Sequence, residues 1–115
     1  MKLYHNPSCS KSREGLALIE QANQEVEVVK YIANPINEEE LRSIVAKLGI
    51  AAEDLVRKKE KIFRENFKGK ELSEDDYIQM MVEYPKLIER PILVKGDKAV
   101  IGRPPEKILE FLQNN

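Results

Sequence analysis

The chain contains a single cysteine and a single histidine, and both lie in the segment His5-Asn6-Pro7-Ser8-Cys9-Ser10-Lys11-Ser12-Arg13. The thiolate is the nucleophilic form of cysteine, and the nearby cations of Lys11 and Arg13 favour it electrostatically. Ser12 follows Cys9 by three residues, where a redox Cys-x-x-Cys motif would carry its second cysteine. Because no second thiol is present, an oxidised Cys9 must be resolved by a thiol from another molecule. We therefore predict that Cys9 is a nucleophile and not a buried apolar side chain.

Two roles are open for His5. Its imidazole acts as a general base or electrostatic helper for the thiolate, or it forms hydrogen bonds that hold the following loop. A metal site needs several ligands at suitable spacing, and one cysteine with one histidine does not supply them. We predict no bound metal.

Cys9 stands between a short apolar segment and a run with helical periodicity. Leu3-Tyr4 is long enough for a strand, and apolar residues recur at helical spacing over residues 16–22. Asn-Pro sequences favour turns, so residues 6–8 are expected to form a loop. Cys9 would then lie at the first turn of a helix. The free N–H groups and the positive end of the helix dipole lower the pKa of a thiol there and can hold an oxyanion beside the sulfur.

The rest of the chain predicts three further strands and four further helices. Runs of β-branched and other apolar residues mark the strands, which are expected at residues 26–32, 92–94 and 99–101. Gly96-Asp97 separates the last two, so they should form a hairpin. Helical periodicity and capping residues such as Asn37 and Ser73 mark the helices, which are expected at residues 37–49, 53–58, 73–84 and 102–112. The charged stretch 57–70 is expected to be partly helical.

The order of these elements predicts an α/β fold. A strand–helix–strand unit should have parallel strands with a right-handed crossover, and the late hairpin should add antiparallel strands. A four-stranded mixed sheet (βαβ followed by ββα) satisfies this order, with a helical insertion at about residues 37–84 between the two halves. This is the thioredoxin-like plan. We expect residues 1–115 to form a single domain, because no repeat or flexible linker interrupts them.

Three arginines are candidates for binding an anion. Arg90 and Arg103 each directly precede a proline at the start of a predicted element, and Arg57 is expected on the short helix at residues 53–58. Guanidinium groups suit tetrahedral oxyanions because they offer paired hydrogen bonds and a permanent charge. Pro91 opens a predicted strand, and cis proline bonds in ordered folds occur chiefly at such tight turns.

The composition excludes several classes of protein. The formal net charge of −1 gives no general attraction to nucleic acid or anionic lipid, so we expect neither as a partner. No apolar run is long enough for a membrane span, and no hydrophobic signal segment opens the chain. One cysteine cannot form an internal disulfide, which excludes a disulfide-stapled secreted scaffold. We expect a cytoplasmic protein, and we interpret Arg42 and Arg64 as surface residues.

Four motifs together resemble a known family. They are the segment around Cys9, Leu55-Val56-Arg57-Lys58, Glu89-Arg90-Pro91-Ile92 and Ile101-Gly102-Arg103-Pro104. In order and spacing, over essentially the whole chain, they resemble those of the glutaredoxin-dependent arsenate reductases, which have a thioredoxin-like fold.

The resemblance implies a role for each motif. Cys9 would attack arsenate, and the oxyanion and the arsenite product would be bound by Arg57, Arg90 and Arg103. Supporting roles would fall to His5, Ser12, Arg13 and Pro91, the last as the cis-proline of the fold. Glutathione would be a co-substrate that acts on the thiol–arsenate adduct, and glutaredoxin would reduce the mixed disulfide. The resemblance implies no tightly bound cofactor, and we expect a monomer.

Two other interpretations remain open. The same single-thiol chemistry would serve a reductase acting on a glutathione mixed disulfide or on another oxyanion. The fold also resembles the Spx-type regulators, which bind RNA polymerase; their redox-sensing members carry two cysteines, and Ser12 stands at the second position here. A protein tyrosine phosphatase loop is excluded, because the required arginine six residues after the cysteine is Gly15.

Overall fold

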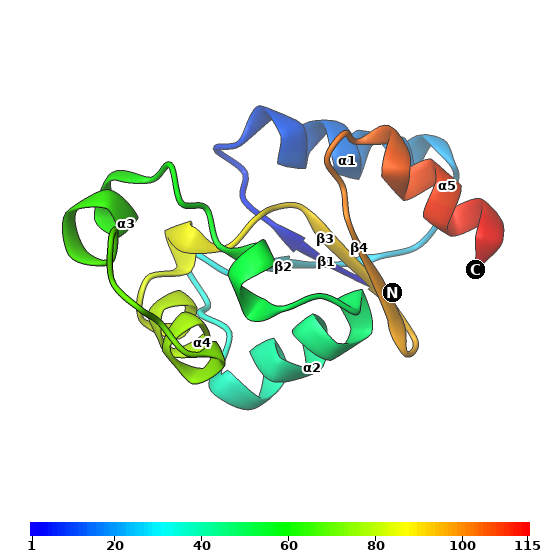
Figure 1. Cartoon of the computed structure of the whole chain (residues 1–115). Coiled ribbons are helices and arrows are strands. Elements are labelled where there is room, and N and C mark those ends of the chain that lie inside the picture. The colour runs from blue at the N-terminus through cyan, green and yellow to red at the C-terminus, as the bar shows by residue number, and fades with distance from the viewer. The chain divides into compact units, whose positions relative to one another are not determined.

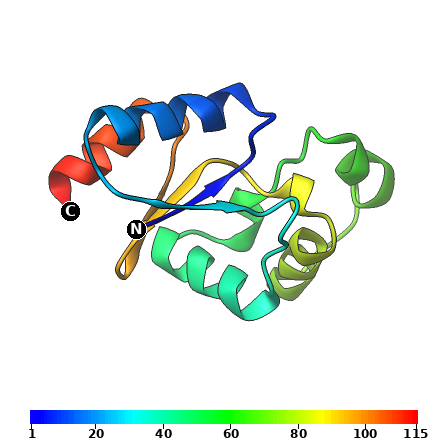
Figure 2. The ribbon, with the colours of Figure 1, turned by 180° about the vertical axis from the view of Figure 1, so that it is seen from behind.

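The computed structural model describes residues 1–115, and the chain divides into two compact units. The first unit consists of Met1–Asn34 and Arg90–Asn115, and the second consists of Pro35–Glu89. Figures 1 and 2 show the elements of each unit from opposite sides.

The first unit contains the predicted four-stranded mixed sheet. Its strands are β1 (Lys2–His5), β2 (Glu27–Lys30), β3 (Ile92–Lys95) and β4 (Lys98–Ile101). They lie in the order β2-β1-β3-β4, with β1 parallel to β2 and antiparallel to β3, and with β3 antiparallel to β4. The predicted parallel βαβ unit and the predicted hairpin are therefore both confirmed.

Two helices cover one face of this sheet, α1 (Ser10–Gln21) and α5 (Glu106–Asn114) (Figures 1 and 2). Side chains from both helices and from the two central strands form a buried cluster, which consists of Leu3, Ile19, Leu93, Ile108 and Phe111. Burying a large aliphatic side chain of this kind contributes about 1.5–3 kcal/mol. This cluster holds α1 and α5 against the central strands β1 and β3, and the cysteine segment connects β1 to α1.

The second strand is shorter than the sequence predicts. β2 ends at Lys30, which pairs with His5, the last residue of β1. Tyr31 and Ile32 were expected in the strand but form a turn, because β1 offers no further backbone groups for them to pair with. Tyr31 is nevertheless fully buried, which explains why its segment has the composition of a strand.

The second unit is helical. Its elements are α2 (Glu38–Leu48), η1 (Ala52–Leu55), α3 (Lys61–Asn66), α4 (Glu74–Glu83) and η2 (Pro85–Leu87). The predicted caps are present: the side chain of Asn37 accepts a hydrogen bond from Glu40 N–H at 2.8 Å, and Ser73 forms a capping box with Asp76. Gly49 ends α2 in the left-handed conformation, φ 69°, that glycine adopts at little cost. None of the helices in either unit is both long and apolar enough to span a membrane.

The helix predicted at residues 53–58 is wrong in type and extent. The structure has a 3₁₀ helix at Ala52–Leu55, and Val56 instead pairs with Ile88 in an isolated antiparallel bridge. Arg57 follows this bridge and donates its backbone N–H to the Leu87 carbonyl at 2.7 Å. The β-branched Val56 favours the extended backbone, and these hydrogen bonds between distant segments replace those of a continuing helix. Arg57 therefore does not lie on a helix.

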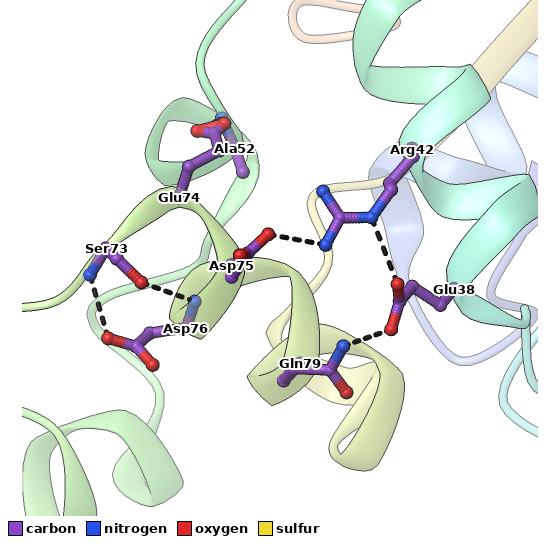
Figure 3. Close-up of polar contacts among 8 residues, drawn as sticks. All are labelled: Glu38, Arg42, Ala52, Ser73, Glu74, Asp75, Asp76 and Gln79. Atoms are coloured by element: carbon purple, nitrogen blue, oxygen red, sulfur yellow. Dashed lines mark hydrogen bonds and ion pairs between the residues drawn. The ribbon is translucent and has the colours of Figure 1, made fainter.

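An exposed polar network joins α2 to α4 within the second unit (Figure 3). The Arg42 guanidinium donates to Asp75 at 2.6 Å and to Glu38 at 3.2 Å, and Gln79 donates to the other oxygen of Glu38. The Arg42 side chain is 40% exposed. Arg42 thus has the surface position that the sequence predicts, and its charge is committed to helix–helix contacts.

Candidate active site

Cys9 is the N-cap residue of α1. Its backbone is extended, with φ −98° and ψ 124°, and its carbonyl accepts the Arg13 N–H at 3.0 Å as the first hydrogen bond of the helix. The preceding loop closes through a 3.0 Å hydrogen bond from Cys9 N–H to the Asn6 carbonyl and another from Ser8 N–H to the Asn6 side chain. The predicted strand–loop–helix placement is confirmed. The half-buried thiol faces the free N–H groups of the first helical turn.

The thiol of Cys9 is more acidic than an ordinary cysteine. Burial raises its pKa, but a hydrogen bond from the Arg90 side chain, the Ser12 backbone N–H, the Arg90 charge and the Lys11 backbone N–H together outweigh burial. The pKa is lowered from 9.0 to about 7. About half of the protein therefore carries a thiolate at neutral pH, which makes Cys9 a competent nucleophile.

Arg90 and Arg103 meet at the sulfur although they come from different elements. Arg103 Nη1 lies 4.0 Å from Cys9 Sγ and donates a 2.9 Å hydrogen bond to the Arg90 backbone carbonyl. The Arg90–Pro91 bond is cis, as anticipated, and the Arg103–Pro104 bond, for which no isomer was predicted, is cis as well. The structure thus brings together two of the three arginines that the sequence singled out.

His5 and Ser12 form a buried pair beneath the loop. His5 Nδ1 lies 2.7 Å from Ser12 Oγ, and Ser12 Oγ also accepts the Asn6 backbone N–H at 3.0 Å. His5 is 4% exposed and Ser12 is fully buried. Burial lowers the pKa of His5, as do the charges of Lys30 and Arg13, against an opposing hydrogen bond that the imidazole donates to the Ser12 backbone. His5 is therefore neutral at pH 7, and its side chain contacts Ser12, which also binds the backbone of the loop.

The side chains of Lys11 and Arg13 are engaged away from the sulfur. Arg13 Nη1 donates to the Pro7 carbonyl at 2.8 Å, and Lys11 Nζ lies 3.5 Å from a carboxylate oxygen of Glu14. The prediction that the charges of Lys11 and Arg13 stabilise the thiolate is therefore wrong. Arg90 supplies the cation, and Lys11 acts through its backbone N–H. Arg13 instead braces the loop that leads to Cys9.

Arg57 belongs to the second unit, where two carboxylates hold it. Its Nε lies 3.2 Å from Glu60 Oε1, and its Nη1 lies 3.5 Å from Glu89 Oε2. The Arg57 side chain is 21% exposed. Sequence reasoning did not single out Glu60, although its position three residues after Arg57 is a recognised spacing for an ion pair. The Arg57 guanidinium is therefore held in place by two carboxylates of its own unit.

No group of three or more histidine, cysteine, aspartate or glutamate side chains is close enough to hold a metal ion. The chemistry visible at the site is that of one thiol, helix N–H groups and two guanidinium groups. These groups suit nucleophilic attack on an electrophile that carries negatively charged oxygens.

The fold and the site define a thioredoxin-like α/β protein with one acidic thiol at the start of its first helix. The sequence profile of the ArsC family matches residues 4–111, and the chain belongs to this family.

Relatives of known sequence and structure extend this finding over nearly the full chain. The chain is 48% identical to the uncharacterized protein YfgD of Escherichia coli K12, over 97% of this chain and 96% of that protein. It is 43% identical to an arsenate reductase of Haemophilus influenzae, over 96% and 97% of the two chains. The solved structure of an arsenate reductase from Vibrio cholerae superimposes with a TM-score of 0.90 at 44% identity, covering 96% of this chain and 97% of that one.

Proposed function

We propose that this protein is an arsenate reductase in which Cys9 is the nucleophile. The observation that carries the proposal is the thiol itself: Cys9 has a pKa of about 7, accepts a hydrogen bond from Arg90 and lies 4.0 Å from the Arg103 guanidinium. Relatives named arsenate reductase at 40–43% identity support arsenate as the substrate.

The first step is attack of the Cys9 thiolate on the arsenic atom. A sulfur–arsenic bond forms, and one arsenate oxygen takes a proton and leaves as water. Arg90 and Arg103 would hold the remaining oxygens with charge-assisted hydrogen bonds, and the N–H groups at the start of α1 would stabilise charge on the oxygen nearest the sulfur. Arg57 is proposed as a third ligand for the arsenate or arsenite oxygens.

The two electrons come from thiols outside this chain, because Cys9 has no resolving partner. Glutathione displaces a second arsenate oxygen as water and forms a second sulfur–arsenic bond. Glutaredoxin then attacks the glutathione sulfur, which breaks this bond and leaves its electron pair on arsenic. The product is a glutathione–glutaredoxin mixed disulfide, so these two thiols lose two electrons while As(V) becomes As(III). Hydrolysis of the Cys9–arsenic bond then releases arsenite and restores the thiol. Glutathione is thus a co-substrate, and the reaction belongs in a reducing cytoplasm.

The experiment is arsenate-dependent NADPH oxidation in the presence of glutathione, glutaredoxin and glutathione reductase. We expect turnover by the wild-type chain and none by Cys9→Ser, because an alcohol cannot replace the thiolate. The matched control is Arg42→Ala, which removes an arginine committed to α2–α4 contacts and should keep wild-type activity.

Turnover that survives in Cys9→Ser would refute the assignment of the nucleophile. Absence of turnover in a folded wild-type chain with a reactive Cys9 would discard arsenate as the substrate. The same coupled assay with a glutathione mixed disulfide in place of arsenate then tests the other single-thiol interpretation.

A further inference from the structure

Two glycines in the first unit lie against the same two side chains. Gly15 is on α1 and Gly102 directly follows β4, and both are buried. A Cβ atom on Gly15 would lie 2.8 Å from Ile108 Cδ1 and 2.9 Å from Pro91 Cγ. A Cβ atom on Gly102 would lie 2.7 Å from Ile108 Cδ1 and 3.0 Å from Pro91 Cγ. Carbon atoms in van der Waals contact normally lie about 3.5–4.0 Å apart, so an alanine at either site forces a neighbour to move.

Backbone conformation does not account for these two glycines. The glycines with positive φ are Gly49, Gly69 and Gly96, so Gly15 and Gly102 have backbone angles that alanine adopts without strain. The close approach of Pro91 and Ile108 is therefore what requires the absence of a side chain at both positions.

This packing is directly connected to the two arginines at the sulfur. Pro91 follows Arg90, and Arg103 follows Gly102. Gly102 N–H donates to the Pro91 carbonyl at 2.8 Å, and Arg103 Nη1 donates to the Arg90 carbonyl at 2.9 Å. A shift of Pro91 or Gly102 therefore displaces the backbone that carries an arginine.

We propose that Gly15 and Gly102 are positioning residues, whose close packing against Pro91 determines where Arg90 and Arg103 stand relative to the Cys9 sulfur. Ile108 is fully buried and lies against both glycines, so it fills the space that a Cβ atom at either glycine would need. The proposal rests on Cys9 acting as a thiolate, as in the proposed function, but it does not depend on arsenate as the substrate.

The charges that act on the sulfur make the consequence measurable. Arg90 and Arg103 face Cys9, whereas the side chains of Lys11 and Arg13 on α1 are held by Glu14 and the Pro7 carbonyl. Moving the Arg90 guanidinium away weakens its stabilisation of the thiolate. The expected result is a thiol that titrates at higher pH, with no residue of the site itself replaced.

The test is the pH midpoint of Cys9 alkylation by iodoacetamide, measured for Gly102→Ala, Ile108→Val and the double variant. Gly102→Ala should raise the midpoint by about 0.5–1 pH unit, a two- to fivefold lower thiolate fraction at pH 7. Ile108→Val removes Cδ1, the atom that lies nearest to the added Cβ, and by itself should leave the midpoint unchanged. The double variant should fall between these two, because the contact with Pro91 Cγ remains.

A wild-type midpoint in Gly102→Ala overturns the proposal. If Gly102→Ala alone does not fold, the double variant decides the question, and a midpoint equal to that of Ile108→Val overturns it. Gly96→Ala is the control for general destabilisation, because Gly96 has φ 62° in the β3–β4 turn with no heavy atom within 4 Å of an added Cβ. A rise in Gly96→Ala as large as that in Gly102→Ala would show that the midpoint follows stability and would also overturn the proposal.

Arsenate turnover by the wild-type chain is measured separately. If turnover is absent but the midpoints follow the expected order, the proposed substrate fails and the positioning role stands. If turnover is present but the midpoints do not change, arsenate stands as the substrate and the positioning role is refuted.

Discussion

Replacing Arg90 with alanine should make Cys9 a weaker acid. Burial of the thiol raises its pKa, and four contributions lower it, two of which are the hydrogen bond and the charge of Arg90. Removing both leaves the Ser12 and Lys11 N–H groups to act against burial, so the pKa should rise from about 7 by about one unit. At pH 7 the thiolate fraction would then fall from about one half to about one tenth.

The rate of alkylation at one pH understates this change. A thiolate whose thiol has a higher pKa is intrinsically more nucleophilic, by about threefold for each unit of pKa. This gain offsets much of a fivefold loss in thiolate fraction. The pH midpoint and the alkaline plateau must therefore be measured separately. We expect a higher midpoint and a higher plateau in Arg90→Ala than in the wild-type chain.

Iodoacetamide labelling from pH 5 to 10 provides both quantities, and the single cysteine makes the signal unambiguous. Arg42→Ala is the matched control, since it removes the same side chain from a network on α2 and α4. An unchanged midpoint in Arg90→Ala would refute the assignment of Arg90 as the cation that acidifies the thiol.

Four other variants or conditions test separate parts of the structure. Ser12→Ala should lower the free energy of unfolding by about 1–3 kcal/mol in urea denaturation, because the buried His5 imidazole and the partly buried Asn6 N–H lose their partner; a loss below about 0.5 kcal/mol would contradict this. The pKa of His5 is lowered in the folded state, so protonation favours unfolding and stability should fall as the pH drops below 6.5; His5→Gln should remove that part of the pH dependence in melting curves. The pKa of Cys9 is also lowered in the folded state, so its contribution to stability should be fully present above pH 9 and lost as the pH falls through 7; Cys9→Ser should show a flatter profile over this range. Asn37→Ala should cost about 1 kcal/mol by removal of the α2 cap, and an unchanged denaturation midpoint would show that solvent replaces the cap.

The sequence predicts the local parts of the candidate site well, because short-range rules determine them. The loop and helix around Cys9 follow from Asn-Pro turn chemistry and from helical spacing in the residues that come next. The acidity of the thiol and the contribution of the helix N–H groups were also predicted correctly, but the charge contribution was assigned to the wrong cations. Arg13 is close to Cys9 in sequence, yet the Pro7 carbonyl holds its side chain, and the acting cation is Arg90 from the far end of the chain.

Pairing between distant segments accounts for the errors in the fold. Val56 and Arg57 have no local signal that stops a helix, and only their hydrogen bonds to residues 87 and 88 show that the backbone is extended there. The end of β2 is determined by the last residue of β1, which the composition of residues 26–32 does not reveal. The sequence likewise does not identify Glu60 and Glu89 as partners of Arg57, because these contacts depend on how the chain folds around Arg57.

The sheet order also has a consequence for the nascent chain. β1 lies between β2 and β3, and β3 and β4 follow the whole second unit in sequence. During synthesis Cys9 emerges long before Arg90 and Arg103, and pairing of β3 with β1 closes the longest loop in the sheet. Until that pairing forms, Cys9 is a thiol without the hydrogen bond and charge of Arg90, so its pKa is higher and less of it is thiolate at neutral pH. The full acidity of the single thiol therefore develops only after Arg90 has been synthesised and β3 has paired with β1.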